Sequence, residues 1–217
     1  MIAVEVDQRL IERLREKFAG AANVTIVEGD ALSMSAAEIL AAGGGGLPFV
    51  VAGNLPYFIG TAIVRKFLRD VLRPRWMVVT LQAEVAENMA AAPGRMGYLA
   101  VQTQVFADAR VLFRIPAKAF RPPPKVGSAV VRLDVHDSPD VEVDDVERFL
   151  ALAAAGFAAP RKRLRNSLAI GLRIVAADAE AMIVRAGLDS AQRPAELSLD
   201  DWRALYFAYR AAPVESR

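Results

Sequence analysis

The sequence predicts an α/β domain with a Rossmann-like sheet, followed by a small all-helical domain. In the first 136 residues, short apolar runs alternate with amphipathic stretches, which is the pattern of parallel strands wrapped by helices. Beyond the acidic stretch at residues 134–147, only helical spacing remains. We therefore expect an α/β domain over residues 1–136 and a helical domain over residues 137–217.

Four strands and an antiparallel pair are expected in the first domain. The strands cover residues 2–6, 24–27, 49–52 and 76–81, and the pair covers residues 110–115 and 128–135. One helix follows from four-residue apolar spacing and ends at Gly20, and another has a face at Ile63, Val64, Phe67, Leu68 and Val71. The glycine run 43–46 is expected to be a flexible loop. In the second domain, helices are expected at about 143–155, 161–172, 177–186 and 199–211, the last capped by Ser198 with Asp201.

Composition excludes several classes of protein and site. Of the 217 residues 54% are hydrophobic, so the chain can bury a sizeable core. With no cysteine, disulfide frameworks and thiolate metal sites are excluded, which is compatible with a reducing, cytoplasmic home. The lone His136 has no partner motif, so we expect no metal site and a surface position for that side chain. No apolar run reaches membrane-spanning length, so no membrane partner is expected.

Charge is unevenly distributed along the chain. The net charge is −1 over residues 1–94, +6 over 95–133, −7 over 134–147 and +4 over 148–217. Two separate basic segments indicate a surface that faces a polyanion, although ordinary solvated faces explain the pattern equally well.

Asn54-Leu55-Pro56-Tyr57 directly follows an apolar strand, so it lies at the carboxyl edge of the expected sheet, where such sheets bind ligands. An adenine amino group is a poor nucleophile because its lone pair is delocalised into the ring. The Asn54 side-chain carbonyl and the Leu55 backbone carbonyl, restricted by the following proline, can accept its two N–H groups and aim the lone pair at a methyl sulfonium. Tyr57 offers a ring for an extruded base, and its hydroxyl is not needed for stacking. The alternative is a strand-to-turn built from ordinary turn formers.

Two carboxylates end the preceding strands. Glu5 is placed to bind both hydroxyls of a ribose, and Asp30 could accept from an adenine amine. Either one alone is more often an ordinary solvated strand end or a helix cap. Together with Asn54 they end three successive strands, which favours a nucleotide site.

Several segments point to one family. They are VEVD at 4–7, GDA at 29–31, GNLPY at 53–57, QAEVA at 82–86, GYLAVQ at 97–102, FRPPPKV at 120–126, SAVV at 128–131, RKRLRNSL at 161–168 and RPAELS at 193–198. With these segments, which span nearly the whole chain, the sequence resembles the small-subunit rRNA adenine N6,N6-dimethyltransferases, which use S-adenosylmethionine.

The resemblance implies a role for each site residue. Glu5 would bind the cofactor ribose, and Asp30 with Ala31 its adenine. Asn54 would lie between the sulfonium and the target amine, and Tyr57 would stack on the target adenine. Phe120 would close the other face of that base, unless it is a core aromatic. RNA phosphates would be met by Lys125, Arg161, Lys162, Arg163 and Arg165, although Arg165 and Asn166 could instead tie the helical domain to the sheet.

The first expected strand already ends in an acidic residue, which is the element that normally comes second in such sheets. We therefore expect the chain to lack the first strand and its glycine-rich cofactor loop, and to bind S-adenosylmethionine weakly. The function expected is methylation of adenine N6 in a hairpin of small-subunit rRNA, within the small-subunit precursor and by a monomer. Two alternatives stay open: a catalytically incompetent RNA- or ribosome-binding homologue, and a large-subunit rRNA methyltransferase of the resistance type.

Overall fold

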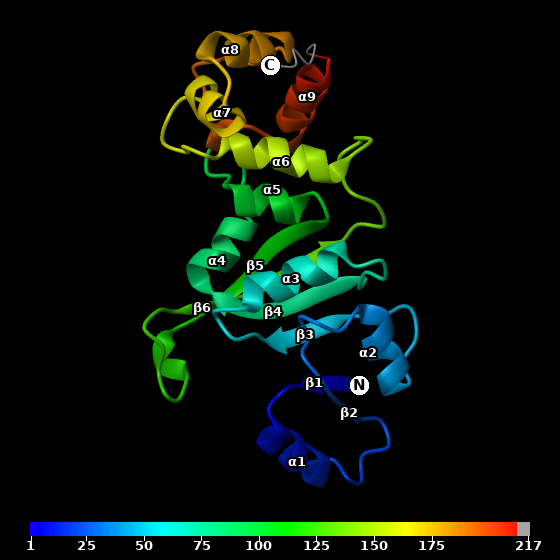
Figure 1. Ribbon diagram of the computed structural model, residues 1–217. Coiled ribbons are helices and arrows are strands. Elements are labelled where there is room, and N and C mark those ends of the chain that lie inside the picture. The colour runs from blue at the N-terminus through cyan, green and yellow to red at the C-terminus, as the bar shows by residue number, and fades with distance from the viewer. Residues whose placement is uncertain (212–217) are drawn as a thin grey trace.

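The computed structural model describes residues 1–211, in which strands and helices alternate up to residue 135 and helices alone follow (Figure 1). This arrangement confirms the expected fold class. Residues 212–217 of the expected helical domain lie outside the described residues. The elements are β1 (Ile2–Glu5), α1 (Gln8–Lys17), β2 (Thr25–Glu28), α2 (Ala36–Gly43), β3 (Val51–Asn54), α3 (Gly60–Arg69), β4 (Trp76–Gln82), α4 (Ala83–Met89), α5 (Tyr98–Gln104), β5 (Ala107–Ile115), β6 (Ser128–Val135), α6 (Val146–Gly156), α7 (Leu164–Leu172), α8 (Ala176–Arg185) and α9 (Leu199–Arg210), with short 3-10 turns at Ala117–Ala119 and Pro194–Glu196.

Within residues 1–211 the strands form two sheets that share no backbone ladder. In one, β1 and β2 are parallel and place Glu5 opposite Glu28. In the other, the order is β3-β4-β6-β5, with β3 parallel to β4 and the remaining pairs antiparallel. Figure 1 shows that β1 and β3 run in the same direction, so that their carboxyl ends lie on the same side of the molecule as the loop 116–127.

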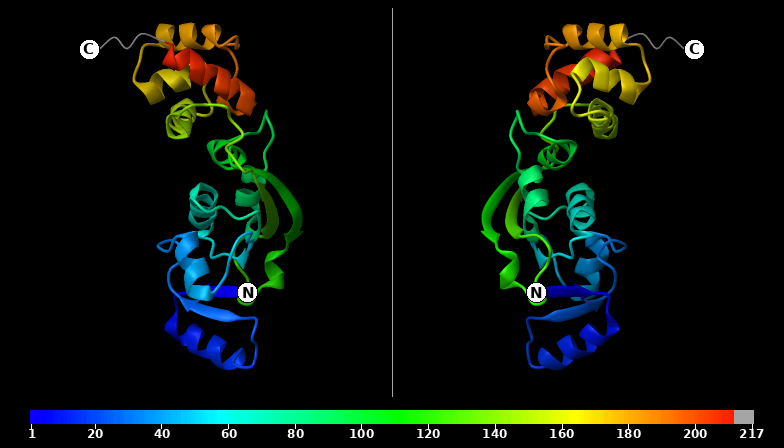
Figure 2. Two further views of the ribbon diagram at one scale, coloured as in Figure 1. Left: turned by 90° about the vertical axis from the view of Figure 1, so that its right-hand side faces the viewer. Right: turned by 90° about the vertical axis from the view of Figure 1, so that its left-hand side faces the viewer.

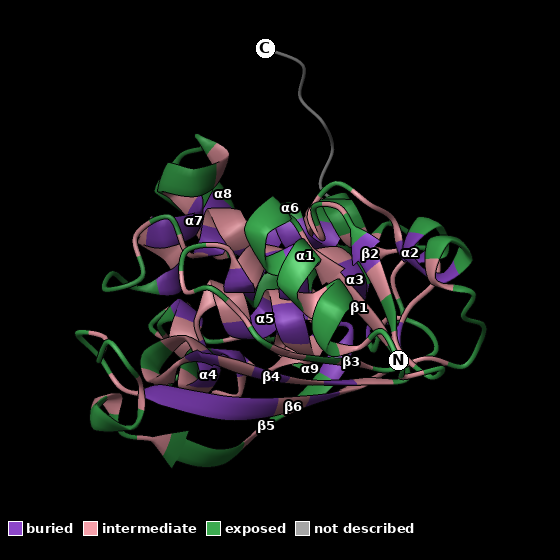
Figure 3. Ribbon diagram, turned by 90° about the horizontal axis from the view of Figure 1, so that it is seen from below, coloured by how far each residue is buried: buried purple, intermediate pink, exposed green. Residues whose placement is uncertain are grey.

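Residue pattern explains the second sheet. Alternate side chains of β4 are buried, at Met77, Val79 and Leu81, as expected for a strand with one face on the core. The first four residues of β6 are all buried because strands flank it on both edges and α4 packs on it. β5 is the edge strand, and much of it is exposed (Figure 3).

One apolar core runs from the four-stranded sheet into the helical part. The ring centroids of Tyr98 in α5 and Phe157 lie 6.3 Å apart, and those of Phe157 and Trp202 lie 5.4 Å apart. Trp202 in α9 is 1% exposed. Figure 2 shows the resulting stack, with helices α6–α9 at one end, the four-stranded sheet in the middle and the β1–β2 sheet at the other end.

The acidic stretch at 134–147 is neutralised inside the chain. Asp144 accepts a hydrogen bond from the Tyr206 hydroxyl at 2.8 Å and pairs with Arg210 at 2.7 Å. The hydrogen bond from Tyr206 holds the pKa of Asp144 below its ordinary value. Glu147 pairs with Arg69 of α3. Part of the negative charge of this acidic stretch is therefore paired with basic residues of α3 and α9.

Three expectations about elements were wrong or incomplete. Helices α2, α4 and α5 were not foreseen, because each is only seven or eight residues long and shows weak periodicity. The glycine run begins inside α2, and Gly44 ends that helix in the left-handed conformation with φ 65°. Val71 was placed on the buried face of α3, but it follows the helix end at Asp70 and is 95% exposed.

His136 was expected at the surface, but its side chain is only 21% exposed. Its Nε2 lies 3.5 Å from a carboxylate oxygen of Asp108. The position of the residue in the sheet accounts for this low exposure. The His136 N–H donates to the Phe106 carbonyl at 2.9 Å, so His136 continues the pairing of β5 with β6.

Replacing Gly171 by Ala should destabilise the helical part. A Cβ at this position of α7 would overlap the backbone carbonyl of Ala155 in α6, and a backbone cannot rotate away. We expect the free energy of unfolding to fall by about 1–3 kcal/mol, despite the higher helix propensity of Ala. Urea denaturation measures the change, and Gly46→Ala, with no atom within 4 Å of its added Cβ, is the control. A Gly171→Ala protein as stable as the control would mean that α6 and α7 do not approach this closely.

Candidate functional site

A cavity of about 340 Å³ opens at the carboxyl end of β3. Its lining comes from two segments far apart in the sequence, and consists of Asn54, Leu55, Pro56, Tyr57, Phe120, Pro122 and Pro124. The tetrapeptide supplies one side, and the loop 116–127 between β5 and β6 supplies the other. The structure thus brings Phe120 to the same cavity as Tyr57, as the expected base site requires.

Asn54 is exposed at this edge. Within residues 1–211 its side-chain amide makes no hydrogen bond, so its carbonyl is open to a ligand. The backbone around it is held by the sheet and by the next helix. Asn54 lies opposite Thr80 of β4, the Leu55 N–H donates to the Thr80 carbonyl at 3.3 Å, and the Gly60 N–H donates to the Pro56 carbonyl at 2.9 Å. A fixed backbone with an unengaged amide is suited to orient a bound polar group.

Tyr57 is anchored through its hydroxyl. Its oxygen lies 2.6 Å from Oγ of Ser128, and Ser128 is fully buried at the start of β6. The expectation that only the ring of Tyr57 matters is therefore incomplete, because this hydrogen bond fixes the direction of the ring. Ser128 was not identified from the sequence, where it is one small residue at a strand start, and only the pairing of β6 beside β4 brings it to Tyr57.

Glu5 ends β1 opposite Glu28, and Asp30 follows the end of β2 by two residues; neither lines the cavity. The Gly29 N–H donates to the Glu5 carbonyl at 2.9 Å, which holds the two strand ends together. One carboxylate oxygen of Glu5 accepts from the Val6 and Asp7 N–H groups, at 2.8 and 2.9 Å. Its second oxygen is directed by these contacts and has no partner within residues 1–211.

Asp30 has the cap-type contacts that the sequence left open. It accepts from the Leu32 N–H at 2.9 Å and from the Ser33 hydroxyl at 3.2 Å. A carboxylate has about four acceptor positions, so these two bonds leave capacity for a ligand amine. Asp30 is exposed, and Ala31 beside it is half-buried. Carboxylates on adjacent parallel strand ends fit the hydroxyls of a ribose and the amine of an adenine.

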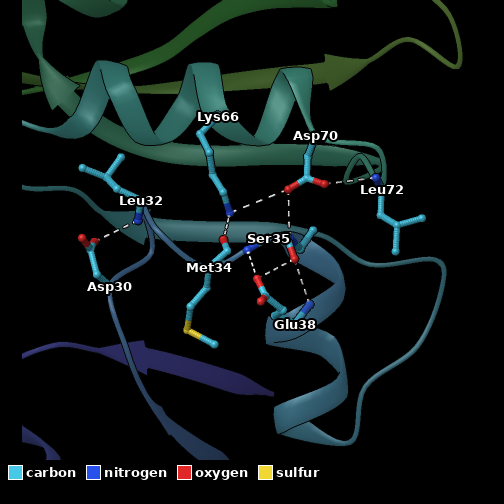
Figure 4. A network of polar contacts seen from close by, with 9 residues as sticks. Asp30, Leu32, Met34, Ser35, Glu38, Lys66, Asp70 and Leu72 are labelled. Atoms are coloured by element: carbon cyan, nitrogen blue, oxygen red, sulfur yellow. Dashed lines mark hydrogen bonds and ion pairs between the residues drawn. The ribbon is translucent and has the colours of Figure 1, made fainter.

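A polar network fixes the segment after Asp30 (Figure 4). Lys66 of α3 donates to the Met34 carbonyl, and Asp70 accepts from the Ala36 N–H at 2.9 Å. Burial lowers the pKa of Lys66, and the nearby Asp70 carboxylate acts in the opposite direction. Nothing in the sequence indicated Lys66 or Asp70, because they meet the segment only after α2 and α3 pack together.

The basic residues expected to meet RNA differ in their surroundings. Within the described part of the chain, the exposed residues Lys125, Arg161, Lys162 and Arg163 make no ion pair. Lys125 follows the cavity-lining Pro124, and the other three lie in the connection between α6 and α7. Arg165 instead pairs with Glu180 of α8 at 3.1 Å, so it joins two helices of the helical part.

Residues 1–211 contain no group of three His, Asp or Glu side chains placed to hold a metal ion. Over the same residues, no helix combines the length and the apolar character needed to cross a membrane.

Comparison with known proteins decides the family. The model of the family described as Ribosomal RNA adenine dimethylase matches residues 1–209. The chain belongs to this family. Its methyltransferases use S-adenosylmethionine.

Three relatives are similar to this chain over almost its whole length. Two proteins named Ribosomal RNA small subunit methyltransferase A, both from Dehalococcoides mccartyi, are similar to it. That of strain 195 is 38% identical over 213 residues, and that of strain BAV1 is 40% identical over 214 residues. Each match covers 98% of this chain and 72% of the relative. A protein of the same name from Phenylobacterium zucineum is 40% identical over 223 residues, covering 99% of this chain and 73% of the relative.

Two solved structures have the same fold. The 23S rRNA methyltransferase ErmE matches with a TM-score of 0.70 and 27% identity, over 95% of this chain and 80% of that one. A dimethyladenosine transferase from Plasmodium falciparum matches with a TM-score of 0.76 and 20% identity, over 96% and 81% of the two chains. At 20% identity, the second match shows only that the chain described here has the same fold as the Plasmodium falciparum protein.

We expect Tyr57 and Ser128 to be energetically coupled. Tyr57→Phe leaves a buried hydroxyl without its partner, which costs about 1–3 kcal/mol, whereas removing both partners is nearly neutral. The double variant Tyr57→Phe/Ser128→Ala should therefore lose less stability than the sum of the two single variants. Denaturant unfolding of all three measures the coupling. Strictly additive losses would show that the two hydroxyls do not interact.

Proposed function

We propose that this chain transfers methyl groups from S-adenosylmethionine to N6 of adenines in a hairpin of small-subunit ribosomal RNA. The observation that carries the proposal is the cavity in which Asn54, Tyr57 and Phe120 meet at the carboxyl end of β3. Family membership supplies the reaction class, and the names of the relatives at 38–40% identity favour the small subunit. ErmE, named for 23S rRNA, keeps the large subunit as the competing substrate. We further propose that the chain acts as a monomer, in the cytoplasm, on a precursor of the small ribosomal subunit and without a membrane partner.

In this proposal the cavity holds the target adenine. Tyr57 and Phe120 contact the two faces of the base, since both rings border the same space. The Asn54 side-chain carbonyl and the Leu55 backbone carbonyl accept the two N–H groups of the amine. This keeps the nitrogen lone pair out of the ring and aimed in one direction. Positioning of this kind lowers the barrier without a covalent intermediate.

The cofactor is assigned to the edge formed by Glu5 and Asp30. When bound, S-adenosylmethionine supplies an electrophilic methyl group. The second carboxylate oxygen of Glu5 would accept from the ribose hydroxyls, and Asp30 and Ala31 would hold the adenine, with Asp30 accepting from its amine; the backbone contacts of both carboxylates leave acceptor positions for this. The contacts that already orient both carboxylates support this assignment, because a ligand then meets them in a preset direction.

RNA phosphates are assigned to two exposed basic groups. Lys125 stands beside the cavity, and Arg161, Lys162 and Arg163 stand in the connection between α6 and α7. Within residues 1–211 these side chains have no carboxylate partner, which supports this assignment, since a paired guanidinium has to break its ion pair before it can bind a phosphate. Arg165 is retained only as a secondary contact, because Glu180 already engages it.

Asn54→Ala should abolish most of the chemistry. The variant loses one of two acceptors for the target amine, so the base stays bound but poorly aimed. We expect the single-turnover methylation rate to fall by about 10²-fold, with RNA affinity unchanged. Tyr57→Ala instead removes the stacking platform and should cost about 1–3 kcal/mol of base binding. Methylation of small-subunit rRNA by both variants measures these effects. A near-parental rate for Asn54→Ala would mean that the tetrapeptide is only a turn, and no methylation by the parent would favour an RNA-binding role.

Salt dependence of RNA binding should separate open from paired arginines. Removing Arg161 and Arg163 together should lower the slope of log affinity against log salt by about 0.7–0.9 for each phosphate that is no longer bound. The matched control removes Arg203 and Arg210, which pair with Glu142 and Asp144. The control should keep the parental slope in filter-binding titrations. Equal slopes for the two double variants would place Arg161 and Arg163 away from RNA.

A further inference from the structure

The site is divided between two parts of the chain that no sheet connects. Residues 1–48 carry Glu5 and Asp30, and the later residues carry Asn54 and the cavity. Because β1–β2 and the four-stranded sheet share no ladder, the backbone does not fix the distance between the two carboxylates and Asn54. That distance can be fixed only by apolar packing and by specific polar contacts between the two parts.

Both polar connections come from α3. Within the described residues 1–211, two hydrogen bonds join residues 1–48 to the later chain: Lys66 Nζ to the Met34 carbonyl, and the Ala36 N–H to Asp70. Lys66 and Asp70 lie one helical turn apart, with 3.7 Å between their charged atoms, and their side chains are 19% and 10% exposed. Figure 4 shows both side chains pointing from α3 toward the segment between Asp30 and α2.

The segment that they hold is short and continuous with Asp30. The Met34 N–H donates to the Asp30 carbonyl at 3.0 Å, so the residue fixed by Lys66 is itself bonded to Asp30. Ala36 is the first residue of α2, where a carboxylate such as Asp70 is favoured by the helix dipole. At its other end, α3 begins at Gly60, whose N–H is bonded to Pro56 of the tetrapeptide. One helix therefore contacts the Asp30 segment and the Asn54 segment.

We propose that Lys66 and Asp70 are positioning residues. They hold the Asp30–Ala36 segment at a fixed distance from Asn54, so that Asp30 can bind the adenine of the cofactor while Asn54 binds the target amine. The proposal rests on the proposed function for the role of Asp30. Lys66 and Asp70 do not touch the cofactor, and they act through the Met34 carbonyl and the Ala36 N–H.

Hydrogen exchange tests the positioning in the 217-residue chain without any ligand. Lys66→Met and Asp70→Ala should each speed amide exchange in residues 30–36 by about tenfold, the effect of losing one hydrogen bond. Exchange in α6–α9 should not change. Lys66→Arg keeps a charged donor and should behave like the parent. Arg65→Met removes a charge from the exposed face of the same helix and is the matched control. If Lys66→Met and Asp70→Ala exchange like Arg65→Met, the proposal is overturned.

A pair of ligands separates positioning from a general loss of structure. Calorimetry compares S-adenosylhomocysteine with its analogue that lacks the adenine amino group. The parent should prefer the first ligand, and Asp30→Ala should abolish that preference. Lys66→Met and Asp70→Ala should reduce the preference several-fold while affinity for the analogue is kept. Equal weakening of both ligands would show a merely structural role and would overturn the proposal.

The positioning role and the proposed function fail in different ways. If the parent binds both ligands equally, or neither, Asp30 does not recognise the adenine and the cofactor part of the proposed function fails. The exchange experiment then still decides whether Lys66 and Asp70 hold residues 30–36. If the parent discriminates and Asp30→Ala does not, but the Lys66 and Asp70 variants exchange like the control, the proposed function stands and the positioning role is refuted.

Discussion

Because the β1–β2 sheet and the four-stranded sheet have no backbone ladder in common, the geometry of the site depends on how α2 and α3 meet. Parallel pairing brings Glu5 and Asp30 together within one sheet, and pairing with β4 fixes Asn54 within the other. The polar contacts of Lys66 and Asp70, with the apolar packing around them, relate one pair of strand ends to the other. The functional roles assigned to Glu5, Asp30 and Asn54 all depend on this contact between α2 and α3.

A second constraint concerns the cavity: the aromatic ring on which a base stacks must already be fixed in position before the base binds. Tyr57 is held from behind by the buried Ser128, and the loop that carries Phe120 is anchored at both ends in the antiparallel pair β5–β6. The exposed Asn54 amide lines the same cavity and has no partner of its own in the described chain. Rigid surroundings and one open polar group suit a reaction in which positioning of the reactants supplies the rate and no covalent enzyme intermediate forms.

Much of this architecture could be predicted from the sequence, and what could not has identifiable physical causes. The expected strands and the helices after residue 142 are confirmed because their apolar spacing is strong, and the antiparallel pair at 110–115 and 128–135 is present. Short helices such as α2 carry too little periodicity to be recognised. Ser128, Lys66 and Asp70 act only across long sequence separations, so no local pattern marks them. Val71 was misplaced because a helical spacing does not show where Asp70 ends the helix.

The central claim is that the cavity at Asn54 accepts an adenine of small-subunit rRNA. It is tested most directly by incubating the chain with S-adenosylmethionine and either small-subunit particles or large-subunit rRNA, and then analysing the nucleosides by mass spectrometry. We expect N6-methylated adenosine, including the dimethyl form, in the small-subunit hairpin alone. Methylated adenosine found only in large-subunit rRNA, or a methyl group on another atom or base, would contradict the claim.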